Sequence, residues 1–154
     1  MWQRKQTLFL ALAASSLVLM IFFPIWVGQL NDQTIALYPL HFTSKTIDKT
    51  TIEYVPFCIT SILAIASATL VLISIKNYKN RLLQIKIGTL NALLMSVTMV
   101  LAVYFATTKM RDFHQVGSYG FSMFIPAFAM ICNTIANWLI RRDEKLVRDS
   151  DRIR

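Results

Sequence analysis

Polar side chains inside long apolar segments are the residues of this chain whose types and spacing could do chemistry. Asn91 lies in one such segment, and Asn133 and Asn137 lie in another. The last two are four residues apart, so on a helix they project from one face. Carboxamides donate and accept hydrogen bonds without titrating, so they could line an ion path, hold a polar ligand or join two helices. We favour interhelical hydrogen bonds, which contribute roughly 0.6 to 2 kcal/mol each in a membrane.

Other reactive side chains give weaker signals. His41 and His114 could meet with Asp112 as a metal or proton site, because imidazole and carboxylate are suitable ligands. Two histidines in separate connections are more typical of solvated loop residues. Cys58 and Cys132 differ in predicted depth by roughly 15 Å, which excludes a disulfide between upright helices. We therefore expect no catalytic residue, no metal, no cofactor and no enzyme activity.

The segments that carry these residues predict an integral membrane protein. Of the 154 residues, 55% are hydrophobic and only 16% are charged, whereas a soluble domain has about 25% charged residues. Segments of about 20 uncharged residues match the thickness of a bilayer core. Four such segments are predicted to be transmembrane helices within one domain, residues 1–154, at residues 7–27, 57–75, 87–105 and 121–140.

Basic residues predict the orientation of these helices. Twelve of the 16 basic residues lie at the chain ends or in the 76–86 connection, and only Lys45, Lys49, Lys109 and Arg111 lie in the other two connections. The positive-inside rule then puts both termini in the cytoplasm, as expected for a bacterial inner membrane protein. The net charge of +8 is explained by this topology and by anionic lipid headgroups on the cytoplasmic side, so we expect no nucleic-acid partner.

The long outer connection, residues 28–56, predicts a small β-hairpin. Its segments 34–38 and 50–55 are rich in Thr, Ile, Tyr and Val and are separated by turn-forming residues. The side chains expected on the covered face are Ile35, Leu37, Ile52 and Tyr54. The predicted fold class is thus an all-α membrane protein, a four-transmembrane-helix bundle with a small extracytoplasmic β-hairpin and a protruding C-terminal cytoplasmic helix.

That protruding helix, residues 141–154, has a thin apolar strip that could dock on a partner, although a solvated or lipid-skimming helix is the commoner outcome for such a pattern. Glu144 and Arg148, like Lys145 and Asp149, are oppositely charged and four residues apart, which braces an exposed helix. The docking candidates combine these charges with an apolar strip; they are Glu144, Leu146, Val147, Arg148, Asp151 and Arg152.

Both ends of the chain resemble a known family. The start, Met1-Trp2-Gln3-Arg4-Lys5-Gln6-Thr7, and the final run from Arg142 to Arg154, RDEKLVRDSDRIR, are similar to an uncharacterised four-helix membrane family of Bacteroidota, domain of unknown function 4293. The resemblance spans the whole chain. It implies an inner-membrane location and no known activity.

Three functions are compatible with these observations. We expect first a non-enzymatic accessory subunit or assembly component that binds the lipid bilayer and a membrane-protein partner, or forms a homo-oligomer. The alternative is a small transporter or channel subunit with a polar path near Asn91, Asn133 and Asn137. A membrane enzyme acting on lipophilic substrates ranks last, because no charged residue lies inside the predicted spans.

Overall fold

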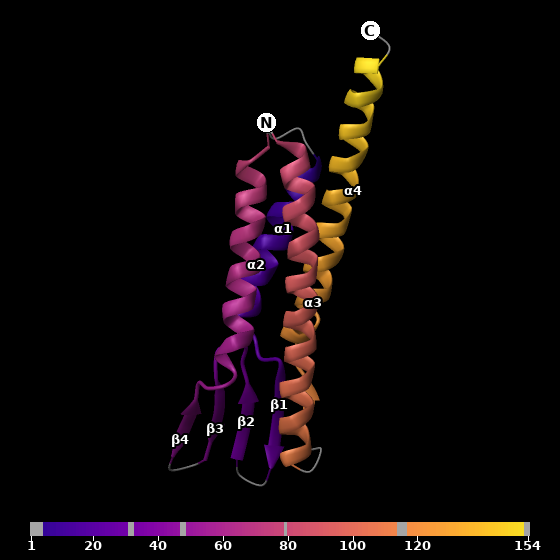
Figure 1. The fold of residues 1–154 in the computed structure, drawn as a ribbon. Helices are drawn as coiled ribbons and strands as arrows, with labels where there is room; N and C mark the ends of the chain where they lie inside the picture. Colours follow the sequence, from indigo (N-terminus) through magenta and orange to yellow (C-terminus); the bar gives the residue numbers. More distant parts are fainter. Residues whose placement is uncertain (1–4, 31–32, 47–48, 79, 114–116, 153–154) are drawn as a thin grey trace.

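The chain folds into side-by-side helices with a β-sheet at one end (Figure 1). The computed structural model describes residues 5–30, 33–46, 49–78, 80–113 and 117–152, except the side chains of residues 30 and 150–152. The elements are, in order, α1 (Lys5–Met20), β1 (Trp26–Leu30), β2 (Gln33–Leu37), β3 (Phe42–Lys45), β4 (Thr50–Glu53), α2 (Cys58–Lys76), α3 (Arg81–Asp112), β5 (Ser118–Tyr119), the 3₁₀ turn η1 (Phe121–Met123) and α4 (Ile125–Arg152). α1 begins and α4 ends at the end opposite the sheet.

The sheet corrects the predicted all-α fold class. It is antiparallel, has five strands among the described residues, and runs in the order β4-β3-β2-β1-β5. The expected hairpin between 34–38 and 50–55 is wrong, because β2 pairs with β1 and β3, and β4 pairs with β3. A small hairpin was expected because Trp26 and Val27 were assigned to the first helix, and neither the rest of β1 nor β3 was recognised as a strand.

Pro24 explains that error. Proline has no backbone donor and cannot continue a helix without losing a hydrogen bond. α1 accordingly ends at Met20, and three turn hydrogen bonds follow, the last from the Phe23 amide to the Met20 carbonyl at 3.4 Å. The chain is extended from Trp26 onward, so the predicted span 7–27 is a 16-residue helix followed by a strand.

The second outer connection completes the same sheet. Its residues Ser118 and Tyr119 form β5, which pairs with Val27 and Trp26 of β1. The preceding Gly117 has φ +142°, and a Cβ there would lie 2.6 Å from an atom of the Trp26 ring. Both the backbone conformation and the close approach of the indole therefore require glycine at this position.

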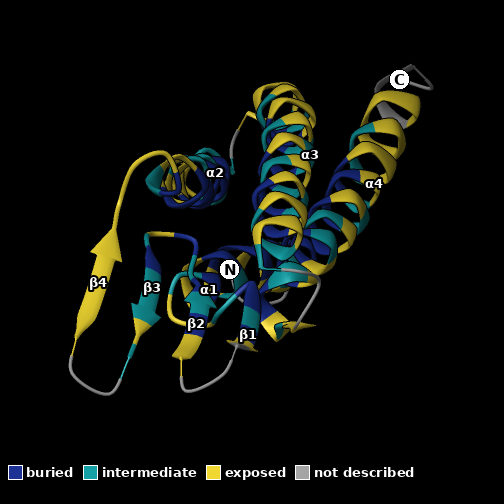
Figure 2. Cartoon of the chain, turned by 90° about the horizontal axis from the view of Figure 1, so that it is seen from below, coloured by how far each residue is buried: buried dark blue, intermediate teal, exposed yellow. Residues whose placement is uncertain are grey.

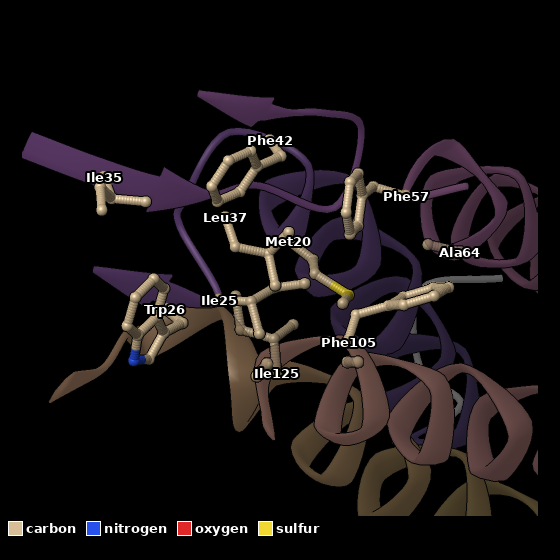
Figure 3. Close-up of a cluster of buried hydrophobic side chains, with 12 residues drawn as sticks. Met20, Ile25, Trp26, Ile35, Leu37, Phe42, Phe57, Ala64, Phe105 and Ile125 are labelled. Atoms are coloured by element: carbon tan, nitrogen blue, oxygen red, sulfur yellow. The ribbon is translucent and has the colours of Figure 1, made fainter. Parts of the chain in front are cut away.

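An apolar core joins the sheet to the helices (Figure 3). Trp26, Leu37 and Phe42 project from the covered face of the sheet and are 0%, 1% and 5% exposed. The Phe42 ring lies 5.8 Å from the Phe57 ring, which lies 5.4 Å from the Phe105 ring of α3. Trp26, which sequence reasoning would place at a membrane interface, is instead a core residue of the sheet.

The predicted covered face is half correct. Ile35 and Leu37 are buried, but Ile52 and Tyr54 are 49% and 53% exposed. Ile52 pairs with Thr43, whose neighbour Phe42 points to the core, so Ile52 points away from it. β4 is also the outermost strand, and Figure 2 shows it exposed along its length.

Three helical segments of the described chain are long and apolar enough to cross a membrane, namely Cys58–Lys76, Arg81–Asp112 and Phe121–Asp149. α3 has 32 residues and extends beyond the predicted span 87–105 at both ends. At about 1.5 Å per residue it is roughly 48 Å long, so it exceeds a hydrocarbon core of about 30 Å. Its last turns pack beside the sheet, where Met110 contacts the core.

The helices contact one another in a cycle. α1 packs against α2 and α4, and α3 packs against the same two helices. Small side chains lie where the helices meet, among them Ala13, Ala68, Ala129 and Ala136, which are at most 5% exposed. Small residues let helix backbones approach closely, which is how helices associate in lipid.

Candidate functional site

Two layers of polar side chains connect α2 and α3 in the interior. The Ser67 hydroxyl donates to Asn91 Oδ1 at 2.6 Å, and Gln84 Nε2 donates to the Ser74 backbone carbonyl at 2.7 Å. The two serines are seven residues apart on α2, and Gln84 and Asn91 are seven apart on α3. Seven residues are two helical turns, so the two polar residues of each helix lie on the same face. Because α2 and α3 are antiparallel, Ser67 meets Asn91 and Ser74 meets Gln84. All four are at most 2% exposed.

α4 adds two carboxamides that pack on a glycine of α3. Asn133 Nδ2 donates to the Gly88 carbonyl oxygen at 2.8 Å. The Asn137 carboxamide lies directly over Gly88, where a Cβ on the glycine would be 2.6 Å from Asn137 Cγ. Gly88 therefore makes the room that Asn137 occupies. We call the residues of α2, α3 and α4 that meet here the carboxamide cluster; they are Ser67, Ser74, Gln84, Gly88, Asn91, Asn133 and Asn137.

The carboxamide cluster retains hydrogen-bonding capacity. Gln84 Oε1, Asn91 Nδ2, Asn133 Oδ1 and Asn137 Oδ1 are buried and make no hydrogen bond with the described residues. A buried polar atom without a partner costs roughly 1–3 kcal/mol. These atoms are one donor and three acceptors that remain available for a hydrogen bond. Since none of the side chains in the cluster titrates in the ordinary pH range, it is not suited to acid–base catalysis.

Three residues of the cluster were predicted from the sequence and the others were missed. The structure buries Asn91, Asn133 and Asn137 and brings them against α2 and α3. Gln84 was missed because it precedes the predicted span 87–105, whereas α3 begins at Arg81. The seven-residue spacing of Gln84 and Asn91 was the available signal. Whether the cluster has a role beyond packing stays a prediction.

The structure describes only two of the three residues of the predicted histidine site. His114 lies outside the described residues. His41 packs against two tyrosines, with its ring centre 5.0 Å from that of Tyr38 and 5.7 Å from that of Tyr54. Asp112 pairs with a lysine instead, because its Oδ2 lies 3.8 Å from Lys109 Nζ. In the described parts of the chain, no three His, Cys, Asp or Glu side chains gather as metal ligands would.

The other candidate site, the end of α4, stands beyond the remaining helices (Figure 1). Leu146 and Val147 are 62% and 45% exposed. Arg81 Nη1 donates to the Asp143 backbone carbonyl at 2.9 Å, which fixes the base of this segment to the start of α3. Asp151 and Arg152 belong to α4, but their side chains lie outside the described ones.

The expected ion pairs along this segment are absent from the described side chains. Neither Glu144 with Arg148 nor Lys145 with Asp149 comes within 4.0 Å. Instead, these four residues border an open hollow of about 390 Å³ between α4 and the first turns of α3. We call it the inner-end hollow; its lining is Ile85, Arg141, Glu144, Lys145, Arg148 and Asp149.

A family model matches almost the whole chain. Its description is domain of unknown function (DUF4293), and it matches residues 2–153. The chain belongs to the DUF4293 family. The resemblance inferred from the two ends of the sequence is therefore confirmed. No curated protein matches the chain.

Membership of the DUF4293 family brings no activity with it, because the family description names none. The three long apolar helices make this DUF4293 protein compatible with a membrane location. Its function has to be argued from the carboxamide cluster and from the exposed end of α4.

Proposed function

We propose that this DUF4293 protein is a non-enzymatic accessory subunit or assembly component of a complex in the bacterial inner membrane. In this proposal α2, α3 and α4 cross the bilayer with α1 packed alongside them. The sheet lies on the extracytoplasmic side, and the start of α1 and the end of α4 lie in the cytoplasm. The basic residues at the ends of α2 and α4 and at the start of α3 support this orientation.

The observation that carries the proposal is the projecting, exposed end of α4. Leu146 and Val147 are adjacent and exposed, and they belong to the last turns of α4. Glu144 and Arg148 flank them with charges of opposite sign. An amphipathic helix of this kind offers its apolar residues to a groove or helix of a partner, and the flanking charges set the register.

Capture of the partner tests the proposal. We would tag the β3–β4 turn, extract the protein from membranes at native abundance in mild detergent, and identify companions by mass spectrometry. The double substitution Leu146→Ser and Val147→Ser should release a stoichiometric companion. Leu82→Ser is the matched control, because Leu82 is also 62% exposed but lies on α3. Recovery of the unsubstituted protein as a lone monomer or homo-oligomer would contradict the proposal.

Cysteine labelling tests the orientation. In a background with Cys58→Ala and Cys132→Ala, single cysteines replace Thr51 of β4 and Asp149 of α4, both of which are exposed. A membrane-impermeant maleimide added to spheroplasts should label the residue on β4 and reach the one on α4 only after lysis. The reverse pattern would overturn the proposed orientation.

The free polar atoms of the carboxamide cluster favour a second candidate, a small transporter or channel subunit. In this candidate Asn91, Asn133 and Asn137 line a path for a polar species. Replacing all three by Leu should abolish flux in liposomes. Thr134→Val is the control, because its hydroxyl donates to the Met130 carbonyl of its own helix at 2.8 Å. Unchanged flux in the triple variant would exclude the path.

A further inference from the structure

We propose that the inner-end hollow binds the headgroup of an anionic phospholipid of the phosphatidylglycerol type. The inference rests on the proposed orientation, which puts this end of the molecule at the inner leaflet. Arg141, Lys145 and Arg148 recur at intervals of four and three residues, so they share one face of α4. That face is turned toward Ile85 of α3, on the other side of the hollow.

The hollow lies at the depth of lipid headgroups. Arg141 follows Ile140, the last buried apolar residue of α4, which is 1% exposed. Trp138, one turn earlier, is 59% exposed, and the Arg142 guanidinium lies 5.8 Å from its ring centre. An exposed tryptophan beside arginine is typical of the boundary between acyl chains and headgroups. A lipid with its chains along α4 would therefore have its phosphate at the level of Arg141.

The charges of the hollow favour a monoanionic headgroup. Its three cations and the two carboxylates of Glu144 and Asp149 give a formal charge of +1. None of these cations lies within 4.0 Å of a described carboxylate, so their N–H donors are free for phosphate oxygens. Guanidinium groups bind phosphate through two parallel hydrogen bonds, which fixes its orientation.

The two carboxylates add selectivity among phospholipids. Glu144 and Asp149 can accept hydrogen bonds from the hydroxyls of a glycerol headgroup or from the ammonium of ethanolamine. The trimethylammonium of choline has no donor to offer them. A single negative charge balances the +1 of the hollow, so the expected order of affinity is phosphatidylglycerol, phosphatidylethanolamine, then phosphatidylcholine.

The hollow is held in shape by its surroundings. Arg81 bonds to the backbone of Asp143 at 2.9 Å, and Asn80 Oδ1 accepts from the Leu83 amide at 3.1 Å at the start of α3. The first contact fixes the start of α3 against α4, and the second caps the N-terminus of α3. The α3 N-terminus also carries a partial positive charge, which adds to the attraction for phosphate.

Thermal unfolding of the purified full chain in non-ionic detergent tests the proposal. Short-chain phosphatidylglycerol should raise the unfolding midpoint in a saturable way, more than the ethanolamine and choline lipids do. Replacing Arg141, Lys145 and Arg148 by Gln should raise the lipid concentration at half-saturation about a hundredfold. The matched control replaces Lys76, Lys86 and Arg142 by Gln; it removes the same charge at the same end, from residues that do not line the hollow. It should retain the response.

A second variant tests the two carboxylates of the hollow and does not depend on the folding of the first. Replacing Glu144 by Gln and Asp149 by Asn raises the formal charge of the hollow from +1 to +3, so it should bind phosphatidylglycerol more tightly and increase its preference over phosphatidylcholine. Equal loss in the hollow triple and the control triple would show diffuse attraction and overturn the site. An equal response to sodium phosphate would overturn the lipid assignment in favour of free phosphate, and an equal response to phosphatidylglycerol and phosphatidylcholine would also overturn it.

The lipid-binding experiment and the partner-capture experiment can fail independently. Headgroup binding is measured on the purified chain without a partner, so a failed capture of companions leaves it standing. Cysteine labelling that put α4 outside would refute the orientation even if the purified chain bound lipid.

Discussion

Replacing Gly88 by Ala should destabilise the protein through one contact, the one with Asn137. An alanine Cβ at this position would lie 2.5 Å from Asn137 Nδ2 and 2.6 Å from Cγ. These distances are too short for contacts of a methyl carbon, which cannot hydrogen-bond to the amide, so the whole carboxamide must move. Asn137 is 9% exposed and has little free space to move into.

The expected magnitude follows from two opposing effects. Overfilling a packed interior costs roughly 1–3 kcal/mol. Replacing glycine by alanine within a helix gains about 0.5–1 kcal/mol when nothing clashes. The net effect of Gly88→Ala is then a loss of about 0.5–2 kcal/mol in the free energy of unfolding. In the background of Asn137→Ala the clash is gone, so the same substitution should stabilise by up to about 1 kcal/mol.

A double-mutant cycle measures this dependence. The four chains are unfolded in mixed detergent micelles by increasing the fraction of denaturing detergent, and helicity is followed by circular dichroism. The coupling between positions 88 and 137 should be about 1–3 kcal/mol. If Gly88→Ala were equally destabilising with and without the Asn137 carboxamide, the contact would not be the cause and the assignment of the cluster would fail.

Three further substitutions probe other contacts. Asn91→Leu should lower the free energy of unfolding by roughly 0.6–2 kcal/mol, measured in the same assay, because it leaves the Ser67 hydroxyl without its acceptor. Lys109→Met should lower it by about 0.5–2 kcal/mol, because Lys109 Nζ lies 4.5 Å from the Phe42 ring centre and 5.5 Å from that of Phe57; hydrogen exchange in β3 should then be faster. Gly117→Ala should cost roughly 1–3 kcal/mol and shift the emission of Trp26 to longer wavelength, because its φ of +142° disfavours a side chain and the indole fills the space.

Each of these substitutions has a control. Thr134→Val removes an exposed hydroxyl that bonds within its own helix, so it should change stability less than Asn91→Leu. Lys45→Met removes an exposed lysine of β3 and should leave hydrogen exchange unchanged. The Trp26 signal is isolated by replacing the other two tryptophans with Phe. If Lys45→Met destabilised the protein and accelerated hydrogen exchange in β3 as much as Lys109→Met, the contact of Lys109 with the Phe42 and Phe57 rings would not be the cause.

Uninterrupted apolar segments were predictable, whereas the span 7–27, which contains Pro24 and the start of β1, and the sheet were not. The predicted span 57–75 agrees with α2 to one residue at each end, because an uninterrupted run of uncharged residues determines both boundaries. The sheet depends on pairing between β1 and β5, which are far apart in sequence and joined by backbone hydrogen bonds that carry no residue signature. A local pattern of alternating residues could find segments 34–38 and 50–55, but it could not identify their partners.

Only part of the carboxamide cluster could be predicted from the sequence. Asn91, Asn133 and Asn137 were visible because a carboxamide is conspicuous in an apolar segment. The part played by Gly88 could not be read from the sequence, because it depends on which side chain of α4 lies over it. Gln84 was hidden by the underestimated length of α3, whose polar first turns do not look like part of a span.

The pairing of β5 with β1 has a consequence for how the chain is made. Ribosomes produce β1 early, whereas Ser118 and Tyr119 follow only after α2 and α3 have been synthesised. Until then the edge of β1 keeps its backbone groups unpaired, and an open edge invites pairing with another chain. The pairing of β5 with β1, like the 2.8 Å hydrogen bond from the Ser122 hydroxyl to the Met20 carbonyl, can form only after α3 has been synthesised. The edge of β1 at Trp26 and Val27 is thus covered only in a chain that has been synthesised beyond β5, so a chain arrested earlier would expose backbone groups that the complete chain pairs.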